Sequence, residues 1–301
     1  MKHPSSVLIL IAIVLLLAAT PRAQARKLKI YISADMEGVA GVVTGDQLGP
    51  QGFEYGKFRE FMTEEVNQAC RAAFNAGATE VVVSDSHGNG ENLLIDKLPP
   101  EVTIVRSWPR RLGMMAGIDE SFDAAIFIGY HASTSNPQGV RAHTFSSARL
   151  ADVKLNGVSV TEGAMNAAIA GQFNVPVIMV SGDDAAVKEV QDAVGPIEGA
   201  VVKWSYGFHS ARTLTPKAAS AQIFLAATRA IARLKDFKPY KLKSPIQLDV
   251  RFKNYRPAEV LAYLPIVQRT DSHSIRFVGK DIVETSNFLQ FITTYEPGLE
   301  P

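Results

Sequence analysis

The fold is decided at residues 28–38, which read Leu28-Lys29-Ile30-Tyr31-Ile32-Ser33-Ala34-Asp35-Met36-Glu37-Gly38. A short apolar run ends there in two carboxylates that stand one residue apart. Apolar runs of this length are typical of buried β-strands, and alternate residues of a strand project to the same side. Asp35 and Glu37 are therefore placed to coordinate one metal ion together at the end of a strand.

The rest of the chain repeats this pattern. Four further apolar runs follow, at residues 81–84, 102–105, 124–129 and 177–181. They are continuous rather than alternating, as in strands of a sheet that is covered on both faces. Apolar residues recur at helical spacing over residues 58–74, and Gly77 is a fitting stop. The sequence predicts an α/β fold, a mostly parallel sheet flanked by helices, with ligands at the carboxyl ends of its strands.

The last part of the chain predicts a smaller unit. A helix rich in Ala and Leu covers residues 215–234, and residues 236–245 form a connection with two prolines. Strands and helices alternate beyond it, with strands at residues 246–252 and 274–278 and helices from about Arg256 and from Asp281. We therefore expect an α/β metal-binding catalytic domain at residues 26–240 and a smaller C-terminal α+β lobe at residues 241–301.

Residues 1–25 have the features of a signal peptide. A weakly basic start precedes a continuous apolar stretch at residues 7–19, and residues 23–25, Ala-Gln-Ala, supply a small-x-small cleavage site. The apolar stretch is shorter than the roughly 20 residues that span a membrane, which favours cleavage over an uncleaved anchor. We expect an exported chain, periplasmic or secreted, that begins at Arg26.

Charge and cysteine content exclude several classes of protein. Removal of the leader takes away Lys2 and Arg22, which leaves 29 of the 31 basic residues against 30 acidic ones. A nearly neutral chain is a poor partner for nucleic acid or for an anionic membrane surface, so we expect neither. The one cysteine, Cys70, excludes an intramolecular disulfide. Its place on the apolar face of a predicted helix indicates a buried structural thiol.

Three more candidate ligands lie at the ends of predicted strands or at the start of a predicted helix. His87 and His131 each follow an apolar run, and Glu162 opens a helix that Thr161 caps. With the first carboxylate pair they make five oxygen and nitrogen ligands from four separate elements, with no cysteine among them. Such a set predicts a site for one or two hydrolytic zinc-like ions, and therefore an enzyme.

The histidines strengthen this hypothesis. The chain beyond the leader has five, and His87, His131 and His143 occupy strand-end or glycine-flanked loop positions. A single loop histidine usually forms a hydrogen bond with a backbone group. Chance is a poor explanation for three histidines at such positions. His209 and His273 lie outside the pattern and are interpreted as ordinary surface or core residues.

Several carboxylates have structural explanations as well. A carboxylate pair at a strand end often caps a helix, and Glu162 is favourable beside a helix dipole. Asp85 either orients the His87 ring or caps its own turn. The pair Asp183-Asp184 is interpreted as a helix N-cap. The sequence has no phosphate loop, dinucleotide fingerprint, HExxH helix or GxSxG elbow. The catalytic and nucleotide-binding mechanisms that depend on these motifs are therefore less well supported than a metal site.

Five motifs follow one another from about Leu28 onward: Ser33-Ala34-Asp35-Met36-Glu37-Gly38, Asp85-Ser86-His87, Gly129-Tyr130-His131-Ala132, the downstream His143 and Thr161-Glu162-Gly163. In order and spacing they resemble the DppA-type D-aminopeptidases, the zinc peptidase family M55. The Ser-x-Asp-Met-Glu-Gly and Gly-Tyr-His elements are the more specific ones. The resemblance runs to the C-terminus.

The resemblance implies a metal role for each candidate ligand. Asp35 would bridge two zinc ions per subunit. Glu37 and His131 would complete the shell of one ion, and His87 and Glu162 that of the other.

The resemblance also implies how the site works and assembles. The family assigns catalysis, as a nucleophile, to the histidine that matches His143. An attacking imidazole is redundant beside a metal-activated water, so we prefer a general acid or base, or a group that stabilises the oxyanion. The characterised family member is a ring-shaped decamer with its sites facing an internal channel, which makes a homo-oligomer the expectation. It removes N-terminal D-residues, notably D-Ala, from short peptides.

This chain departs from the family pattern in two ways. It carries an export signal, and the loop at residues 133–139, between His131 and His143, has one extra residue. The favoured hypothesis is an exported di-zinc aminopeptidase that acts on short D-amino-acid peptides. Two alternatives stay open: a metallohydrolase of another amide or of a phosphate ester, and a non-catalytic periplasmic protein that captures a metal or a peptide.

Overall fold

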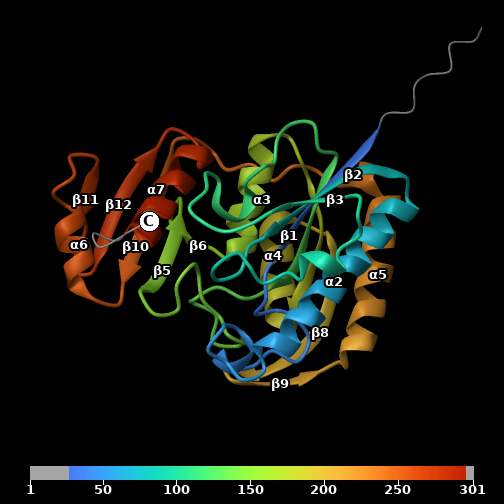
Figure 1. Ribbon diagram of the computed structural model, residues 1–301. Coiled ribbons are helices and arrows are strands. Elements are labelled where there is room, and N and C mark those ends of the chain that lie inside the picture. Colours follow the sequence, from blue (N-terminus) through green and yellow to red (C-terminus); the bar gives the residue numbers. More distant parts are fainter. Residues whose placement is uncertain (1–26, 296–301) are drawn as a thin grey trace, which may run out of the picture.

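The structure is a computed structural model that describes residues 27–295. The predicted signal peptide, residues 1–25, lies outside the described residues. Within residues 27–295, no helix is both long enough and apolar enough to cross a membrane. Two sheets organise this part of the chain, one of seven strands and one of five (Figure 1).

The larger sheet is mostly parallel. Its strands are β1 (Leu28–Ala34), β2 (Ala78–Asp85), β3 (Val102–Val105), β4 (Ala124–Tyr130), β7 (Val177–Asp183), β8 (Glu198–Gly207) and β9 (Ser210–Thr213). They lie in the order β3-β2-β1-β4-β7-β8-β9, and only β9 runs antiparallel to its neighbour. All five strands predicted from apolar runs are present, and the predicted α/β fold class is confirmed.

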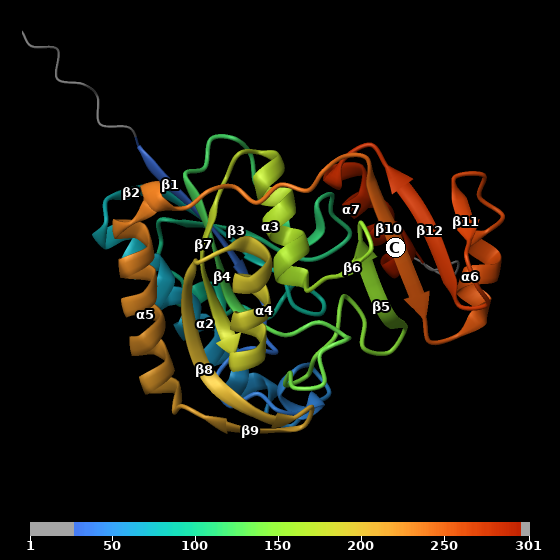
Figure 2. The ribbon, with the colours of Figure 1, turned by 180° about the vertical axis from the view of Figure 1, so that it is seen from behind.

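Four helices cover the larger sheet, two on each face (Figures 1 and 2). They are α2 (Tyr55–Asn75) and α5 (Pro216–Ala232) on one face, and α3 (Glu162–Gln172) and α4 (Asp184–Val194) on the other. Along β1, Ile30 and Ile32 pack with the first pair of helices, whereas Tyr31 packs on the side of the second pair. The strand is apolar without interruption because both of its faces are buried.

Local signals set the helix ends as predicted. The Thr161 hydroxyl accepts a hydrogen bond from Ala164 N–H at 2.8 Å and caps α3. The Asp183 carboxylate accepts from Ala186 N–H at 2.9 Å and caps α4. Gly77, with φ of +89°, ends the turn that follows α2. These caps use two of the polar residues that flank the site, so the N-cap interpretation of Asp183 is confirmed.

The smaller sheet is antiparallel throughout. Its strands are β5 (Leu150–Leu155), β6 (Val158–Ser159), β10 (Ile246–Phe252), β11 (Val267–Arg269) and β12 (Ser274–Gly279), in the order β11-β12-β10-β5-β6. Helices α6 (Tyr255–Leu261) and α7 (Ile282–Thr294) accompany it. The sheet thus combines two separated stretches of chain, because β5 and β6 precede residue 240. The division into domains at residue 240 stays a prediction.

One hydrophobic cluster joins the two sheets. It contains Phe127 of β4 and Ile169 of α3 on the side of the larger sheet. It also contains Leu248 of β10 and Leu289 of α7 on the side of the smaller sheet. Helix α7 lies between the smaller sheet and α3 (Figure 2). The smaller sheet is therefore docked on the larger one through buried side chains.

Strands β8, β9 and β11 were not predicted from the sequence. In β8 the charged Lys203 follows the apolar residues 200–202, and its last residues are half-buried or exposed. β9 is mostly exposed, and β11 has three residues. Short or partly exposed strands have no continuous apolar run, so the pattern that found the central strands does not find these.

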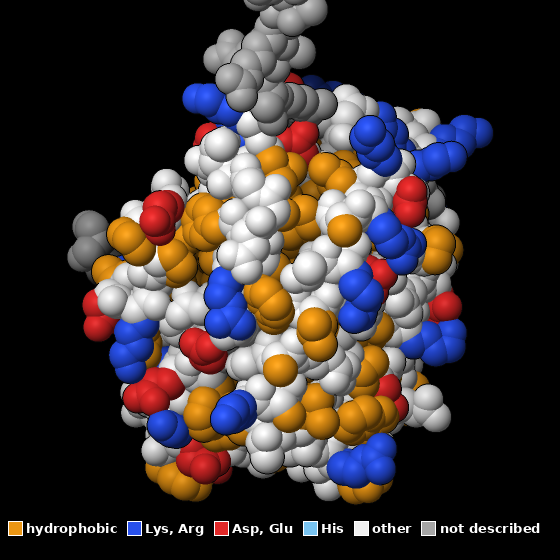
Figure 3. Space-filling view, turned by 90° about the vertical axis from the view of Figure 1, so that its right-hand side faces the viewer, with side chains coloured by type: hydrophobic (Ala, Val, Ile, Leu, Met, Phe, Trp, Pro, Cys, Tyr) orange, Lys and Arg blue, Asp and Glu red, His pale blue; other side chains and the backbone are white. Residues whose placement is uncertain are grey.

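The face over α2 and α5 carries charges of both signs. Figure 3 shows Lys and Arg scattered with Asp and Glu among apolar groups on this face. On α2, for example, Lys57 and Glu60 form an ion pair of 2.7 Å. This mixture is what a nearly neutral composition leads one to expect.

The carboxyl ends of the central strands lie level. Ala34 pairs with Asp85 of β2 and with Ile128 of β4. Strands β2 and β3 extend the sheet on one side of β1, whereas β4 lies on its other side. Open α/β sheets place their ligand sites at such a reversal of strand order. Residues that follow β1, β2 and β4 therefore meet at one edge.

Two glycines let the loop after β1 lie against the end of β4. Gly38 N–H donates a hydrogen bond to the Gly129 carbonyl at 2.7 Å. A Cβ at Gly129 would lie 2.2 Å from the Asp35 carbonyl oxygen, and one at Gly38 would lie 2.1 Å from the Tyr130 carbonyl oxygen. Both positions therefore require glycine.

We predict that Gly129→Ala destabilises the protein far more than Gly157→Ala. Both glycines have positive φ, +71° and +85°, but a Cβ at Gly157 meets nothing within 4 Å. The control therefore measures backbone strain alone, about 1 kcal/mol, whereas the clash at Gly129 adds to it for a total of about 3 kcal/mol or more. Urea denaturation measures both losses, and equal losses would contradict the close contact.

Candidate metal centre

The structure brings together all six residues predicted from the sequence, at the carboxyl edge of the larger sheet. Their elements differ: Asp35 and Glu37 follow β1, His87 follows β2, His131 follows β4, His143 lies in the loop before β5, and Glu162 opens α3. They line one cavity of about 390 Å³. All are buried except His143, which is partly exposed. Their convergence is observed, and their roles as ligands stay predictions.

The Asp35 carboxylate lies between two imidazoles. Its Oδ1 is 3.2 Å from His87 Nδ1, and its Oδ2 is 3.3 Å from His131 Nε2. Met36 N–H donates to Oδ1 at 2.8 Å and so holds the carboxylate in place. Each oxygen faces a different histidine, which is the arrangement that a carboxylate needs to bridge two ions.

Glu37 and Glu162 close the cage on its two sides. Glu37 Oε2 is 2.8 Å from His87 Nδ1, and Glu162 Oε1 is 3.5 Å from His131 Nε2. Phe145 N–H donates to the same Glu162 oxygen at 2.6 Å. Three carboxylates therefore point into one buried space, and each has an imidazole beside it.

Backbone carbonyls fix the orientation of each histidine. The contacts are Leu48 O with His87 Nε2 at 2.7 Å, Ala132 O with His131 Nδ1 at 3.0 Å, and Arg141 O with His143 Nδ1 at 2.8 Å. A carbonyl oxygen only accepts, so these ring nitrogens carry the proton. In the neutral ring the opposite nitrogen then offers its lone pair to the cavity. Metal-binding histidines are commonly oriented in this way.

Two buried atoms of the cage have no hydrogen-bond partner within the described residues. They are Asp35 Oδ2 and His131 Nε2, which face one another. A buried polar atom without a partner costs free energy, so such pairs need an explanation. The donor atoms of Asp35, Glu37 and His131 lie within 4.8 Å of one another, as do those of His131, His143 and Glu162. Oxygen and nitrogen donors at this spacing fit a cation such as zinc.

The charges of the cage favour cations as well. Burial lowers the pKa of His131, but the Glu162 and Asp35 carboxylates outweigh it and raise the pKa well above the usual 6.5. The pKa of His87 rises in the same way against burial, because of Glu37 and Asp35. For Asp35 itself, burial and the Glu37 charge raise the pKa. The cage thus holds excess negative charge that protons or metal ions must balance.

His143 lies beside the cage rather than inside it. Its ring stacks on that of His131 with 4.1 Å between centroids. Its Nε2 is 4.0 Å from Glu37 Oε1 and 3.8 Å from Glu162 Oε1. With Nδ1 held by a backbone carbonyl, Nε2 is the atom that faces the cavity. This position suits a group that exchanges protons with a bound ligand.

Two buried charged residues that the sequence analysis missed hold the loop of Glu37. Lys203, wholly buried in β8, donates hydrogen bonds to the backbone carbonyls of Glu37, Val39 and Val42, the last two at 3.1 and 2.8 Å. Glu65 of α2 accepts from Ala40 N–H at 3.0 Å. A lysine inside the apolar run of residues 200–204 was the available signal, because a lysine is almost never buried without partners.

The remaining polar candidates have structural roles. Asp85 accepts from Asn92 N–H at 2.6 Å and from Leu93 N–H at 2.7 Å, so it caps its own turn rather than orienting the His87 ring. Asn92 Nδ2 in turn donates to the His87 carbonyl at 2.6 Å. Cys70 is buried on α2, and burial raises its pKa to about 12, which makes it an unreactive thiol.

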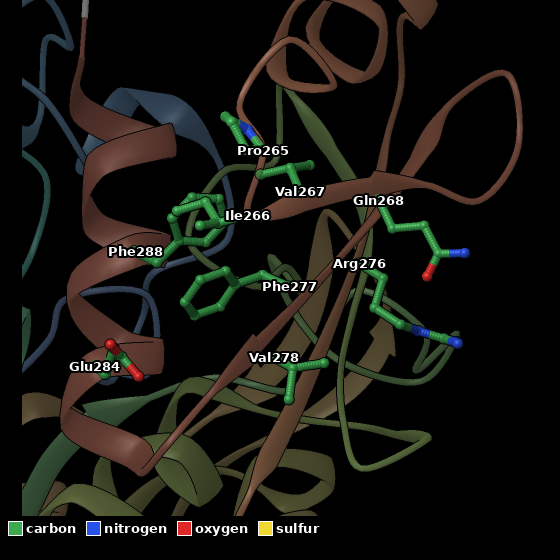
Figure 4. A pocket seen from close by; sticks show the side chains of 9 residues that line it. All are labelled: Pro265, Ile266, Val267, Gln268, Arg276, Phe277, Val278, Glu284 and Phe288. Atoms are coloured by element: carbon green, nitrogen blue, oxygen red, sulfur yellow. The ribbon is translucent and has the colours of Figure 1, made fainter.

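A second cavity, shown in Figure 4, lies on the smaller sheet and has a different character. Phe277 and Phe288 stack within it, with 4.2 Å between ring centroids. Its charged residues are Arg276 and Glu284. Arg276 forms an ion pair with Asp249 at 2.7 Å, so its positive charge already has a structural partner. The chemistry therefore concentrates in the cavity of the six candidates.

A parallel α/β sheet with carboxylates and imidazoles caged at its carboxyl edge defines a metal-dependent hydrolase. The comparisons with known proteins make this class specific. The chain belongs to peptidase family M55, whose model, described as D-aminopeptidase, matches residues 28–291.

Two relatives from Bacillus subtilis illustrate the likeness. A D-aminopeptidase of strain 168 is 33% identical over 267 residues, which make up 88% of this chain and 97% of the relative. A solved structure is described as the Zn-dependent D-aminopeptidase DppA, a self-compartmentalizing protease. It matches with a TM-score of 0.84 and 31% identity, over 90% of this chain and 100% of that one. The family predicted from the motifs is confirmed.

We predict that Glu65 makes stability depend on pH. Burial raises the pKa of Glu65 from 4.5 to about 7, although Ala40 N–H and Lys203 act against it. Between these values the folded state keeps a proton that the unfolded state releases, so this group lowers the free energy of unfolding as pH rises from about 4.5 to about 7. Glu65→Gln removes this contribution.

Urea denaturation at pH 5 and pH 8 measures the effect. Relative to wild type, the Glu65→Gln variant should be more stable at pH 8 than at pH 5. Glu64→Gln, an exposed neighbour on the same helix, is the control and should track wild type at both values. An equal stability difference at the two pH values for Glu65→Gln would contradict the buried carboxyl.

Proposed function

We propose that this protein is a zinc-dependent aminopeptidase that binds two zinc ions per subunit and removes N-terminal D-residues, such as D-Ala, from short peptides. The observation that carries the proposal is the Asp35 carboxylate between His87 and His131, with one oxygen toward each ring. A single-ion site has no need of such symmetry. The relative from Bacillus subtilis that is described as Zn-dependent supports zinc as the metal.

The five caged residues would share the two ions. Asp35, Glu37 and His131, whose donor atoms lie within 4.8 Å of one another, would hold the first. His87 and Glu162 would hold the second, with Asp35 as the bridge. This partition follows the family resemblance. The three carboxylates would offset most of the positive charge of two zinc ions.

When bound, zinc supplies Lewis acidity that activates water and polarises a carbonyl. The residues of this chain supply position and proton transfer. His143 presents Nε2 to the cavity while Arg141 O holds its Nδ1–H. Nε2 is thus placed to take a proton from the attacking water and to give it to the departing amine, as a general acid and base.

The cavity fits a short peptide. It has a volume of about 390 Å³, and the cage closes its floor. Trp108, Met114 and Phe145 contribute apolar surface to its wall. A peptide that enters with its N-terminal residue first would present its first peptide bond to the cage, which accounts for removal of one residue at a time.

We further propose export and assembly into a ring of identical subunits, for which the family resemblance implies a decamer. Export rests on the sequence of residues 1–25. Assembly rests on the relative described as self-compartmentalizing and on large apolar side chains exposed on the helices and connecting segments beside the smaller sheet. They are Tyr255, Val260, Tyr263, Ile266, Phe291 and Tyr295. Exposed apolar groups that gather in this way are typical of protein interfaces.

The function is tested with purified protein and three substrates, D-Ala-D-Ala, L-Ala-L-Ala and nitrophenyl phosphate. We expect cleavage of the D-dipeptide alone, loss of activity on treatment with a chelator, and recovery on addition of zinc. Preference for L-Ala-L-Ala would contradict the D-specificity, and release of phosphate alone would indicate a phosphoesterase. Tight zinc binding without turnover of any substrate would indicate a binding protein.

We predict that His131→Ala lowers both zinc content and peptidase activity, the latter by at least about 100-fold. His209→Ala is the matched control, because His209 is exposed and lies outside the cage. Elemental analysis of the purified variants measures the metal, with about two zinc ions per subunit expected for wild type. A His131→Ala variant that keeps full zinc content would remove His131 from the ligand set.

We predict that His143→Ala keeps both zinc ions yet loses activity by about 100-fold or more, because only proton transfer is removed. The measurements are elemental analysis and kcat on D-Ala-D-Ala. Activity like that of wild type would exclude His143 from the mechanism. Loss of zinc together with activity would make it a ligand instead.

A further inference from the structure

The cavity has a charged floor and a wall of different chemistry. Its floor consists of the carboxylates and imidazoles of the cage, whereas part of its wall comes from the loop before β5 and from the last turns of α7. These contribute Phe145 and Arg149 from the loop, and Gln290, Thr293 and Thr294 from the helix. Among the residues that line the cavity, Arg149 is the one lysine or arginine.

Arg149 is held in place without being neutralised. Its Nη2 donates a hydrogen bond to the Thr293 carbonyl at 2.7 Å, which ties the side chain to the last turn of α7. Within residues 27–295 it forms no ion pair with a carboxylate, and its side chain is exposed. The remaining N–H groups of the guanidinium are thus free for a ligand. An anion that enters the cavity meets a fixed, unpaired positive charge.

We propose that Arg149 binds the free C-terminal carboxylate of the peptide substrate. This inference rests on the proposed function. A short peptide has an amine at one end and a carboxylate at the other. With its first residue at the cage on the floor, its carboxylate extends toward the wall, where Arg149 is the one cationic side chain. A guanidinium suits that group because it donates two parallel hydrogen bonds to a carboxylate.

The proposal assigns a substrate class to the site. A cation at a fixed place favours peptides whose carboxylate reaches it, such as dipeptides and tripeptides. A peptide that continues beyond this point, or that ends in an amide, loses the charge-assisted hydrogen bonds. The enzyme therefore selects short peptides with free carboxylates.

Arg149 also has a structural role, which the test has to separate from binding. A cation at the C-terminal end of α7 stabilises the helix through its carbonyls. This role is satisfied by the single bond to Thr293 and is the same for every substrate. Binding of a carboxylate, in contrast, appears only as a difference between substrates with and without that group.

The test compares D-Ala-D-Ala with its C-terminal amide, D-Ala-D-Ala-NH₂, as substrates of the zinc-loaded protein. We expect wild type to prefer the free acid by about tenfold in kcat/KM. In Arg149→Met this preference should disappear, through a higher KM for the acid with kcat little changed, because the contact exists before and during the reaction. Arg149→Lys, which keeps the charge, should recover part of it.

Arg256→Met is the matched control. Arg256 is an exposed arginine of α6. It lines an adjacent apolar groove but does not line this cavity. The variant should keep the wild-type preference. Equal cleavage of acid and amide by wild type, or equal loss of both in Arg149→Met, overturns the inference and leaves the proposed function intact. Cleavage of neither substrate by wild type overturns the proposed function, and this inference with it.

Discussion

Buried negative charge is the constraint on which the rest of this structure depends. Asp35, Glu37 and Glu162 share one cavity, and burial of three carboxylates is costly unless cations balance them. Backbone N–H groups supply only part of that balance, through Met36 to Asp35 and Phe145 to Glu162. The imidazoles face the carboxylates with the nitrogen that the backbone leaves free. The arrangement leaves negative charge that bound metal would balance.

The fold concentrates this charge by placing three parallel strands level at a reversal of strand order. Close contact between the loop after β1 and the end of β4 requires glycine, since a Cβ at Gly129 would overlap the Asp35 carbonyl. On the other side, the Lys203 ammonium binds three carbonyls of the loop that carries Glu37. The ligand loops are thus fixed from both sides before any metal binds, which lowers the entropy cost of binding.

Much of this was predictable from the sequence, for physical reasons that also explain what was missed. The central strands are found because burial on both faces leaves continuous apolar runs, and the strand-end residues Asp35, His87 and His131 follow directly from them. Lys203 left only one signal, a lysine inside the short apolar run of residues 200–204. Arg149 left none, because an arginine in a loop has no pattern of its own. The smaller sheet was assigned to the end of the chain, since the pairing of β5 with β10 is a long-range contact that local periodicity does not contain.

The smaller sheet and its helices help to form the cavity of the cage. Their sequence does not suggest this, because it contains few candidate ligands. Helix α7 supplies Gln290, Thr293 and Thr294 to the wall of the cavity and anchors Arg149. One hydrophobic cluster packs Leu289 of α7 with Ile169 of α3, the helix that Glu162 opens. The wall and the floor of the cavity therefore sit on elements that share a core. A change in how the two sheets dock would move this wall relative to the cage, so the packing that stabilises the fold also sets the distance between the wall and the floor of the cavity.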